Sequence, residues 1–516
     1  MRFITKGFKR YDAVLFVVAL LSVLLYIKVA NGGFPLDDSW IHQVYGRNLA
    51  QTGQWAFVPG VPSAASTSPL FTVLLSIGYR LNIPYTFWTY ALGIIALWVA
   101  GMLAARMTER LLPKPKYAGI IGGLAVIGAW HLIWAASSGM ETMLFSMWTL
   151  ILISLSWREL DERSTTAKDI VLRGVSFGVL AGLATVTRPE GVALAGLIGL
   201  IMLIVRPQKS WRGVIIWGVS AGVAFMVVIS PYLLLNLSLT GGLLPDTAAA
   251  KQAENAPLLA VSYPGRIINF LFHLFAGGQI LLIPGMIYFG VVILRQMYEN
   301  RRALLFLIPL LWAVGLIALY AARLPAPYQH GRYVIPALPS LILTGVVGTA
   351  YLIQRGQRST TGRVLSRSLA ISTGLAFVYF AFIAGPGVYG QDVRIIDEEM
   401  VASAHWIADH IPPEQLLAVH DIGAVGYFAP RPIIDLAGLV SPEIIPFITD
   451  PDPLWKWMQD RGARYLMAFP DQIPGKRTDD PRLCVVFTTN GVTSPAAGGP
   501  NMTVYELAWD GICPPH

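Results

Sequence analysis

The sequence predicts a polytopic α-helical membrane protein with a small α/β domain at its C-terminus. Of its 516 residues, 54% are hydrophobic and only 13% are charged, whereas ordinary soluble domains carry about 25% charged residues. Long apolar segments alternate with short basic loops, the pattern of membrane proteins whose cytoplasmic loops carry Lys and Arg. From residue 386 onward the apolar segments stop, and acids, prolines and turn signals take their place.

The apolar segments give about eleven candidate spans, since a spanning helix needs about 20 apolar residues. They lie at 12–30, 85–108, 117–136, 141–157, 170–187, 191–206, 212–234, 278–296, 303–321, 333–353 and 367–385. The basic N-terminus is expected to be cytoplasmic and the first span to be an uncleaved signal anchor. Alternation from there also places the other basic loops inside, such as "RMTERLLPKPK" and "QRGQRSTTGRVLSR".

Two shorter apolar stretches, 68–81 and 265–275, are expected to lie in the outer interface or to dip back into the membrane without crossing it. If 68–81 were a span, every later basic loop would change sides. The odd number of spans then places the C-terminal part outside the cell membrane. The predicted division is therefore a transmembrane domain over 1–385 with outer loops, and an extracytoplasmic α/β domain over 386–516.

The C-terminal part alternates between strand and helix patterns, which favours an α/β domain. The runs "LLAVH", "PIIDL", "RYLMAF", "LCVVFTT" and "TVYELAW" predict strands, and "IIDEEMVASAHWIADH" and "DPLWKWMQDRGA" predict helices. Both cysteines, Cys484 and Cys513, fall here. Because thiols oxidise outside the cytoplasm, we expect them to form a disulfide if their strands are neighbours.

Composition excludes some other classes of protein. The formal net charge of +8 could suggest nucleic acid, but the basic residues lie in loops between apolar runs and form no folded basic module. No CxxC, HxxxH or HExxH spacing indicates a zinc site, so His42, His330 and His420 are expected to be structural rather than metal ligands.

With this topology, the unusual polar residues gather at the outer side of the membrane. They are Asp37, Asp38, His42, Glu141, Arg188, Glu190, Asp246, Lys251, His330 and Arg332. Ionisable groups at the ends of apolar helices are costly and tend to mark a functional site. Because outer loops far apart in the sequence contribute both acids and bases, we expect a cavity at the outer face.

Several of these residues also have a purely structural interpretation. Asp37 and Asp38 could cap the helix that begins near Ser39, and Glu141 also lies near a helix start. A cap needs only one acid, however, and two neighbouring acids repel each other.

The basic residues leave similar alternatives. Arg188 and Glu190 could pair at the end of a span, and Lys251 could simply be solvated in its loop. Arg332 could extend to the interface, although it lies on the outer side, where such residues are disfavoured, so anion binding is the favoured interpretation.

At these residues the sequence resembles the GT-C superfamily of integral membrane glycosyltransferases. The acidic pair of "FPLDDSW" stands in the first outer loop and is followed by "RNLAQTGQWAFVPG" and "STSPLFTVLLS". Together with "TRPEG", "LLPDTAAAK", "GRYVIPALP" and "AVHDIGAVGYFAPRPIIDLAGLVSPE", it is similar to the branch of mycobacterial-type terminal arabinofuranosyltransferases. "LLPDT" departs at Asp246 from the "LPNT" associated with such chains.

The resemblance implies an inverting transfer of a sugar from a polyprenyl-phosphate donor to a cell-envelope glycan or glycoconjugate at the outer face. It implies Asp37 and Asp38 as the catalytic pair, with Asp37 as the base because the first acid has that role in the relatives. A divalent metal (Mg²⁺, Mn²⁺ or Ca²⁺) on Asp37 and Asp38 stays open. The substrate-binding residues are expected to be His42, Glu141, Arg188, Glu190, Asp246, Lys251, His330, Arg332, His420 and Asp421.

Two other classes of protein stay in consideration. A lipid-linked sugar transporter or flippase would place polar groups near the membrane midplane and often repeats internally, but here they gather at one face and no repeat is visible. A wall-anchored binding protein would use only its C-terminal part, and would not need so many spans with outer-face charges. Membrane lipid, the lipid-linked donor and a glycan acceptor are the expected partners.

Overall fold

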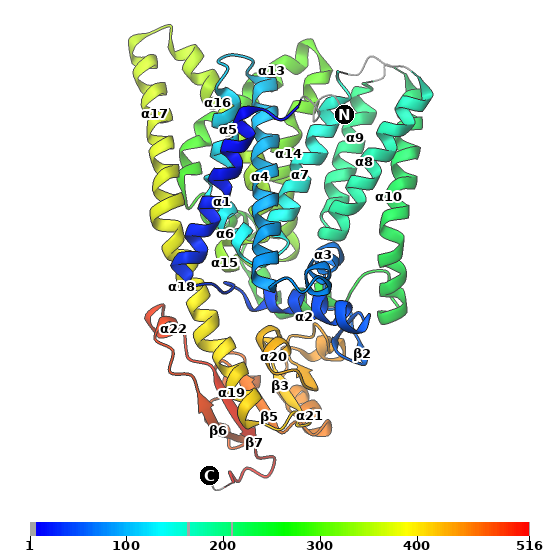
Figure 1. Cartoon of the computed structure of the whole chain (residues 1–516), viewed down its shortest axis with the longest axis vertical. Helices are drawn as coiled ribbons and strands as arrows, with labels where there is room; N and C mark the ends of the chain where they lie inside the picture. The colour runs from blue at the N-terminus through cyan, green and yellow to red at the C-terminus, as the bar shows by residue number, and fades with distance from the viewer. Residues whose placement is uncertain (1–6, 162–165, 208–209, 515–516) are drawn as a thin grey trace.

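The computed structural model describes residues 7–161, 166–207 and 210–514 and shows a helical bundle with a sheet domain at one end (Figure 1). Parts of three segments that the sequence predicts to be cytoplasmic, residues 1–6, 162–165 and 208–209, lie outside the described residues.

Eight helical segments of the described chain are long and apolar enough to cross a membrane. Their principal helices are α1 (Arg10–Ala30), α4 (Tyr85–Leu111), α8 (Ala167–Thr187), α10 (Trp211–Thr240), α13 (Ile283–Glu299), α14 (Leu304–Arg323), α16 (Leu338–Gly356) and α17 (Thr360–Tyr379). A bent pair, α5 (Ala118–Ile127) and α6 (Trp130–Ser137), turns by 55° at its break and makes a ninth span if both halves cross as one.

The mostly helical architecture is confirmed, but the number of eleven spans stays a prediction. Each predicted span coincides with one of these helices or with α7 (Thr142–Arg158) or α9 (Gly191–Val205), which are apolar but shorter. At 1.5 Å per residue the 15 residues of α9 extend about 23 Å, less than the hydrocarbon core of about 30 Å.

The two apolar stretches excluded from the predicted spans form short helices, α3 (Pro69–Arg80) and α12 (Tyr263–Leu274), of 12 residues each. Such a helix is about 18 Å long and cannot cross a bilayer alone. Helix α3 lies beside α2 (Asp37–Thr52) at the end of the bundle next to the sheet domain (Figure 1). A two-stranded hairpin, β1 (Ala56–Val58) and β2 (Val61–Pro62), follows α2.

The two ends of the bundle differ in charge. The start of α1 and the α16–α17 connection lie at one end, and α2, α3 and the sheet domain lie at the other (Figure 1). Arg110, Arg301, Arg302 and Arg358 lie at or beyond the ends of helices that reach the first end. By the positive-inside rule this end is expected to face the cytoplasm, which would place the sheet domain outside.

The C-terminal sheet has five strands in the order β4-β3-β5-β7-β6. They are β3 (Leu417–Val419), β4 (Ile433–Asp435), β5 (Tyr465–Ala468), β6 (Leu483–Thr488) and β7 (Thr503–Leu507). The three strands β4, β3 and β5 run parallel, and β7 and β6 are added antiparallel. All five predicted strands are present, and three helices accompany them, α20 (Ile422–Phe428), α21 (Pro451–Asp460) and α22 (Thr493–Ala496).

No break in the backbone separates the last span from the C-terminal part. One helical segment of 51 residues, Thr360–His410, runs from α17 through α18 (Gly385–Ile396) and α19 (Ala402–His410). A π-helical turn at Phe380–Ala384 stands directly before Gly385 and Pro386. Since proline lacks the N–H of a regular helix, this wider turn lets the helix continue past it.

Helix α2 and the sheet domain share one hydrophobic core. Trp40 and Val44 of α2 are buried with Val425 of α20 and Met467 of β5. The Trp40 ring lies 4.7 Å from that of Phe428, centroid to centroid. The sheet domain therefore packs on α2 and is more than a tail joined by one linker.

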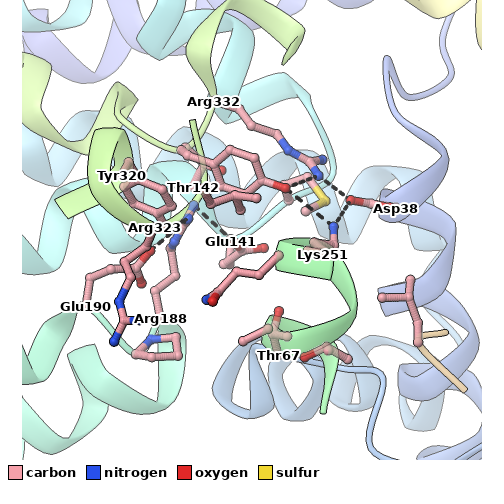
Figure 2. Close-up of a pocket in the computed structure, with 18 of the residues that line it drawn as sticks. Asp38, Thr67, Glu141, Thr142, Arg188, Glu190, Lys251, Tyr320, Arg323 and Arg332 are labelled. Atoms are coloured by element: carbon pink, nitrogen blue, oxygen red, sulfur yellow. Dashed lines mark hydrogen bonds and ion pairs between the residues drawn. The ribbon is translucent and has the colours of Figure 1, made fainter. Parts of the chain in front are cut away.

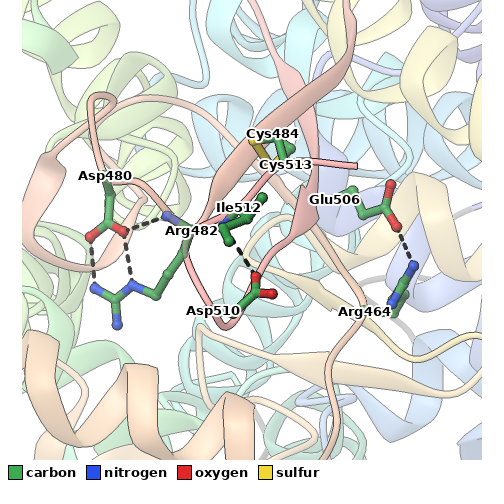
Figure 3. The surroundings of a disulfide bond; sticks show 8 residues. All are labelled: Arg464, Asp480, Arg482, Cys484, Glu506, Asp510, Ile512 and Cys513. Atoms are coloured by element: carbon green, nitrogen blue, oxygen red, sulfur yellow. Dashed lines mark hydrogen bonds and ion pairs between the residues drawn. A yellow bond between two sulfur atoms is a disulfide. The ribbon is translucent and has the colours of Figure 1, made fainter. Parts of the chain in front are cut away.

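The predicted disulfide is confirmed. Cys484 lies in β6, Cys513 lies just beyond β7, and the two form a bridge (Figure 3). The strands β6 and β7 are antiparallel neighbours, with Cys484 opposite Glu506. Glu506 also forms an ion pair with Arg464, the residue directly before β5. The bridge ties the C-terminal segment to the outer strand of the sheet.

Orientation can be tested by labelling intact cells with a membrane-impermeant maleimide. Neither native cysteine is free, so the background should be low. A cysteine replacing Ala256, which follows α11 at the sheet-domain end, should be labelled from outside. A cysteine replacing Arg358, in the α16–α17 connection, should be labelled only after permeabilisation. The opposite labelling pattern would show that the proposed orientation in the membrane is wrong.

Candidate active site

A cavity of about 300 Å³ lies where the end of the helical bundle meets the sheet domain. Its walls come from α2, α7, α14, the α8–α9 connection, the segment before α16 and the short helix α11 (Thr247–Glu254), and Leu439 of the sheet domain closes one part. Its ionisable residues are Asp38, His42, Glu141, Arg188, Glu190, Lys251, Arg323 and Arg332 (Figure 2).

Asp38 is held between two cations on one side of the cavity (Figure 2). Its Oδ2 accepts a hydrogen bond from Lys251 Nζ at 3.1 Å and another from Arg332 Nη2. Both cations also contact the Tyr333 hydroxyl, at 3.5 Å from Lys251 and 3.1 Å from Arg332. The Asp38 side chain keeps 27% of its surface exposed, so it is accessible from the cavity.

The charge state of Asp38 follows from these contacts. Burial alone would raise the pKa of a carboxyl group, but the charges of Lys251 and Arg332 outweigh burial and hold the pKa of Asp38 well below its usual range. For Lys251, burial lowers the pKa and the Asp38 carboxylate more than offsets this, so the pKa of Lys251 is raised. The pair is therefore fully ionised at neutral pH.

Arg332 enters the site from an unusual turn. Gln329, His330 and Gly331 before it all have positive φ angles, of 50°, 61° and 70°, a conformation that non-glycine residues rarely adopt and that often occurs at functional sites. Arg332 is only 6% exposed. Its Nε and Nη1 are buried and have no hydrogen-bond partner in the described part of the chain, so two of its three nitrogen atoms have unused N–H groups.

A second charged group surrounds Arg188 on the other side of the cavity (Figure 2). Arg188 Nη2 donates to Glu190 Oε1 at 3.1 Å and to the Tyr320 hydroxyl at 2.8 Å, and Nη1 lies 3.5 Å from Glu141 Oε1. His42 Nε2 lies 3.3 Å from Glu141 Oε2. Glu190 Oε2 is buried without a hydrogen-bond partner among the described residues, although its side chain lines the cavity.

Among the residues of this cavity that sequence reasoning missed are Tyr320, Arg323 and Tyr333. The rings of Tyr320 and Tyr333 stack, with centroids 5.3 Å apart. Arg323 ends α14 at the sheet-domain side, and an arginine at the outer end of an apolar helix is the same signal that singled out Arg332. Tyr333 follows Arg332 directly, but a tyrosine at a helix start carries no specific signal.

Other predicted site residues do not line the cavity: Asp37, Asp246, His330, His420 and Asp421. His330 Nε2 lies 2.7 Å from Asp392 Oδ2, and the same oxygen accepts from Trp134 Nε1 at 2.8 Å, so this histidine belongs to the packing of the bundle. Asp246 stands directly before α11, where its carbonyl accepts from Ala250 N–H at 2.9 Å.

His420 and Asp421 lie in the sheet domain, beside α11. His420 Nε2 is 2.9 Å from Glu254 Oε1 of α11, and Nδ1 is 3.3 Å from Asp421 Oδ1. Asp421 Oδ2 accepts from Gln472 Nε2 at 2.7 Å. Burial lowers the pKa of a histidine, but these two carboxylates outweigh it and raise the pKa of His420 well above its ordinary value.

The two adjacent aspartates do not fit a shared metal ion. Both Asp37 carboxylate oxygens accept backbone N–H groups, from Gly423 and Ala424, and Asp38 is occupied by two cations. Across residues 7–161, 166–207 and 210–514, no group of three or more His, Cys, Asp or Glu side chains could hold a metal ion.

The chain is similar to several known proteins. A terminal β-(1→2)-arabinofuranosyltransferase of Corynebacterium glutamicum is 27% identical over 369 residues, which are 66% of this chain and 52% of the relative. The structure of ArnT from Cupriavidus metallidurans bound to undecaprenyl phosphate superposes with a TM-score of 0.62 at 15% identity and covers 98% of this chain and 99% of that one.

The structure of the mycobacterial arabinofuranosyltransferase AftD superposes with a TM-score of 0.51 at 16% identity, over 97% of this chain and 42% of that one. These relatives are GT-C glycosyltransferases. The chain has the GT-C fold. It spans about half the length of the curated relative that it matches. Residues 387–505, which include four strands of the sheet and the start of β7, also match a family described as "Domain of unknown function (DUF8728)".

Proposed function

We propose that this protein is an inverting glycosyltransferase that moves a sugar from a polyprenyl-phosphate donor to a hydroxyl of a cell-envelope glycan or glycoconjugate at the outer face of the membrane. The observation that carries the proposal is the ionised Asp38 between Lys251 and Arg332 in a cavity at the end of apolar helices. The relatives named above, a terminal arabinofuranosyltransferase and a protein bound to undecaprenyl phosphate, support it.

Lys251 and Arg332 are the proposed binding groups for the donor phosphate. Two nitrogen atoms of Arg332 are buried without hydrogen-bond partners among the described residues, and guanidinium groups bind phosphate through paired, charge-assisted hydrogen bonds. The cavity lies at the end of the apolar bundle. A phosphate bound here would leave its lipid tail in the bilayer and its sugar in the cavity.

Asp38 is the proposed general base. It accepts the proton of the acceptor hydroxyl while the acceptor oxygen attacks the anomeric carbon of the donor sugar. The bond from that carbon to the phosphate oxygen breaks, and polyprenyl phosphate leaves with the electron pair, stabilised by Lys251 and Arg332. A single displacement of this kind inverts the anomeric centre.

Donor binding would also activate the base. In the substrate-free site, the charges of Lys251 and Arg332 suppress the basicity of Asp38. A donor phosphodiester anion that takes over these cations removes their hold on Asp38, so the pKa of its carboxyl rises toward its ordinary range. Asp38 then becomes a base only when the donor is present.

The group around Arg188 suits the sugars. Glu190 Oε2 is a buried acceptor without a partner among the described residues, and Glu141 and the Tyr320 hydroxyl surround the same arginine. Sugars carry several hydroxyl groups, and such carboxylates can accept hydrogen bonds from them.

In this proposal the division of the chain is that expected from the sequence, 1–385 and 386–516, with the N-terminus cytoplasmic.

A transporter without chemistry is not favoured. The charged residues of the cavity lie at one end of the bundle and not at its middle. The relatives named above whose activity is stated are transferases.

Asp38→Asn should separate chemistry from binding. A purified-protein assay with a panel of polyprenyl-phosphate sugars should show turnover by the wild type and a loss of about 10²- to 10⁴-fold in kcat for the variant, the usual contribution of a general base. Binding of undecaprenyl phosphate should be unchanged or tighter, because Lys251 and Arg332 lose their internal anion. Near-normal turnover would refute Asp38 as the base.

Arg332→Ala should have the opposite signature. A charge-assisted hydrogen bond is worth about 1.5–3 kcal/mol, so undecaprenyl phosphate should bind roughly ten- to a hundredfold more weakly. Arg358→Ala, at the other end of the bundle, is the matched control and should leave binding unchanged. Equal effects of the two substitutions would contradict a phosphate site at Arg332.

A further inference from the structure

The two neighbouring acids of α2 contact different parts of the protein. Asp37 is only 7% exposed. Its Oδ2 accepts the Gly423 N–H at 2.6 Å and its Oδ1 accepts the Ala424 N–H at 2.8 Å. These are the second and third residues of α20, whose N–H groups have no partner inside their own helix. Asp37 therefore caps the start of a helix that lies far along the chain, since the two N–H donors are 386 and 387 residues after it.

Helix α2 also binds the other end of α20. Arg47 Nη1 donates to the Tyr427 carbonyl at 2.8 Å and Nη2 donates to the Gly426 carbonyl at 3.0 Å. Carbonyl groups in the last turn of a helix likewise lack partners within the helix. One helix thus supplies an acid for the N–H end of α20 and an arginine for its C=O end. The two helices lie next to each other in Figure 1.

The close approach leaves no room for side chains on the facing glycines. A Cβ atom on Gly423 would lie 2.0 Å from the Asp37 carbonyl oxygen, and a Cβ on Gly426 would lie 2.2 Å from the Phe57 ring. Because the first of these obstacles is backbone, it cannot move aside. The "DIGAVGYF" segment therefore fits α2 only with glycine at position 423.

The sheet domain also contacts α11, which carries Lys251. His420 Nε2 lies 2.9 Å from Glu254 Oε1 of α11. A Cβ on Gly438 would lie 3.4 Å from that of Ala250, so the chain after β4 packs directly on the same helix. The next residue, Leu439, lines the cavity. The sheet domain therefore touches both helices whose side chains form the Asp38–Lys251 pair.

We propose that Asp37 is a positioning residue and that Asp38 is the only member of the pair to contact substrate. Asp37 and Arg47 together fix α20 on α2, and we call these contacts at the two ends of α20 the seat. The seat aligns the sheet domain so that Leu439 closes the cavity and α11 places Lys251 next to Asp38. The role of Asp37 in turnover rests on the function proposed above, but the seating itself does not.

The seat can be tested by hydrogen–deuterium exchange of the full-length protein in nanodiscs. In Asp37→Ala, Arg47→Ala and Gly423→Ala, the amides of residues 422–428 should exchange about five- to tenfold faster than in the wild type, as expected for a lost cap. Asp38→Asn is the matched control and should leave this exchange unchanged. The core around Trp40 should keep the variants folded.

Comparison of two substitutions at Asp37 distinguishes positioning from proton transfer. Asparagine keeps one of the two oxygens that accept the N–H groups of α20, whereas alanine keeps neither, and neither residue can act as a base. A positioning residue predicts that Asp37→Asn retains activity within about tenfold of the wild type, that Asp37→Ala loses more, and that Arg47→Ala behaves like Asp37→Ala.

The contrary outcome is equally specific. If Asp37→Asn and Asp37→Ala are equally inactive while residues 422–428 stay protected in both, and Arg47→Ala is fully active, Asp37 acts in the chemistry and the proposal is wrong. If no variant or wild type shows transfer, the exchange data still decide whether the seat exists, and only the proposed function fails.

Discussion

Adjacent residues of an α-helix point about 100° apart, because the helix has 3.6 residues per turn. This constraint makes Asp37 and Asp38 point in different directions at the start of α2, and it determines which of the two reaches the cavity. One carboxylate turns toward the sheet domain and accepts two N–H groups of α20. The other turns toward the cavity and meets Lys251 and Arg332. The same short helix therefore joins the two parts of the chain and supplies the acid of the site.

The electrostatics of the cavity follow from what α2 brings together. Buried cations are costly unless an anion compensates them, and Asp38 supplies that anion in the substrate-free protein. We infer that the donor phosphate replaces Asp38 as the partner of Lys251 and Arg332, which would couple donor binding to release of the base. The positive charge of Arg188 is already compensated by Glu141 and Glu190, so this group suits uncharged sugar hydroxyls better than a phosphate.

Hydropathy, charge and alternation patterns predict the elements of this fold well. Every predicted span coincides with a helix and every predicted strand is present, because both depend on local periodicity. The disulfide follows from two cysteines in the part expected to lie outside the cytoplasm, provided that their strands are neighbours, and β6 and β7 meet that condition. The proposed boundary at 385 falls inside one continuous helical segment, because a change in composition does not by itself end a helix.

The site was predicted only in part, since sequence shows which residues lie at the outer end but not the direction of each side chain. Asp38, Lys251, Arg332 and the Arg188 group meet in one cavity. His330 came from the same short motif as Arg332 but turns into the bundle to meet Asp392. The capping interpretation of the acidic pair named the right interaction but the wrong helix, because the helix that Asp37 caps, α20, is distant in sequence.

The central claim is that Asp38 and the donor phosphate share one pair of cations. The most direct measurement is an experimental structure of the full-length protein with undecaprenyl phosphate bound. The account predicts phosphate oxygens within hydrogen-bonding distance of Lys251 Nζ and the Arg332 guanidinium, with Asp38 released toward the cavity. A phosphate bound at Arg188 or Arg323, with the contacts of Asp38 to Lys251 and Arg332 intact, would contradict it.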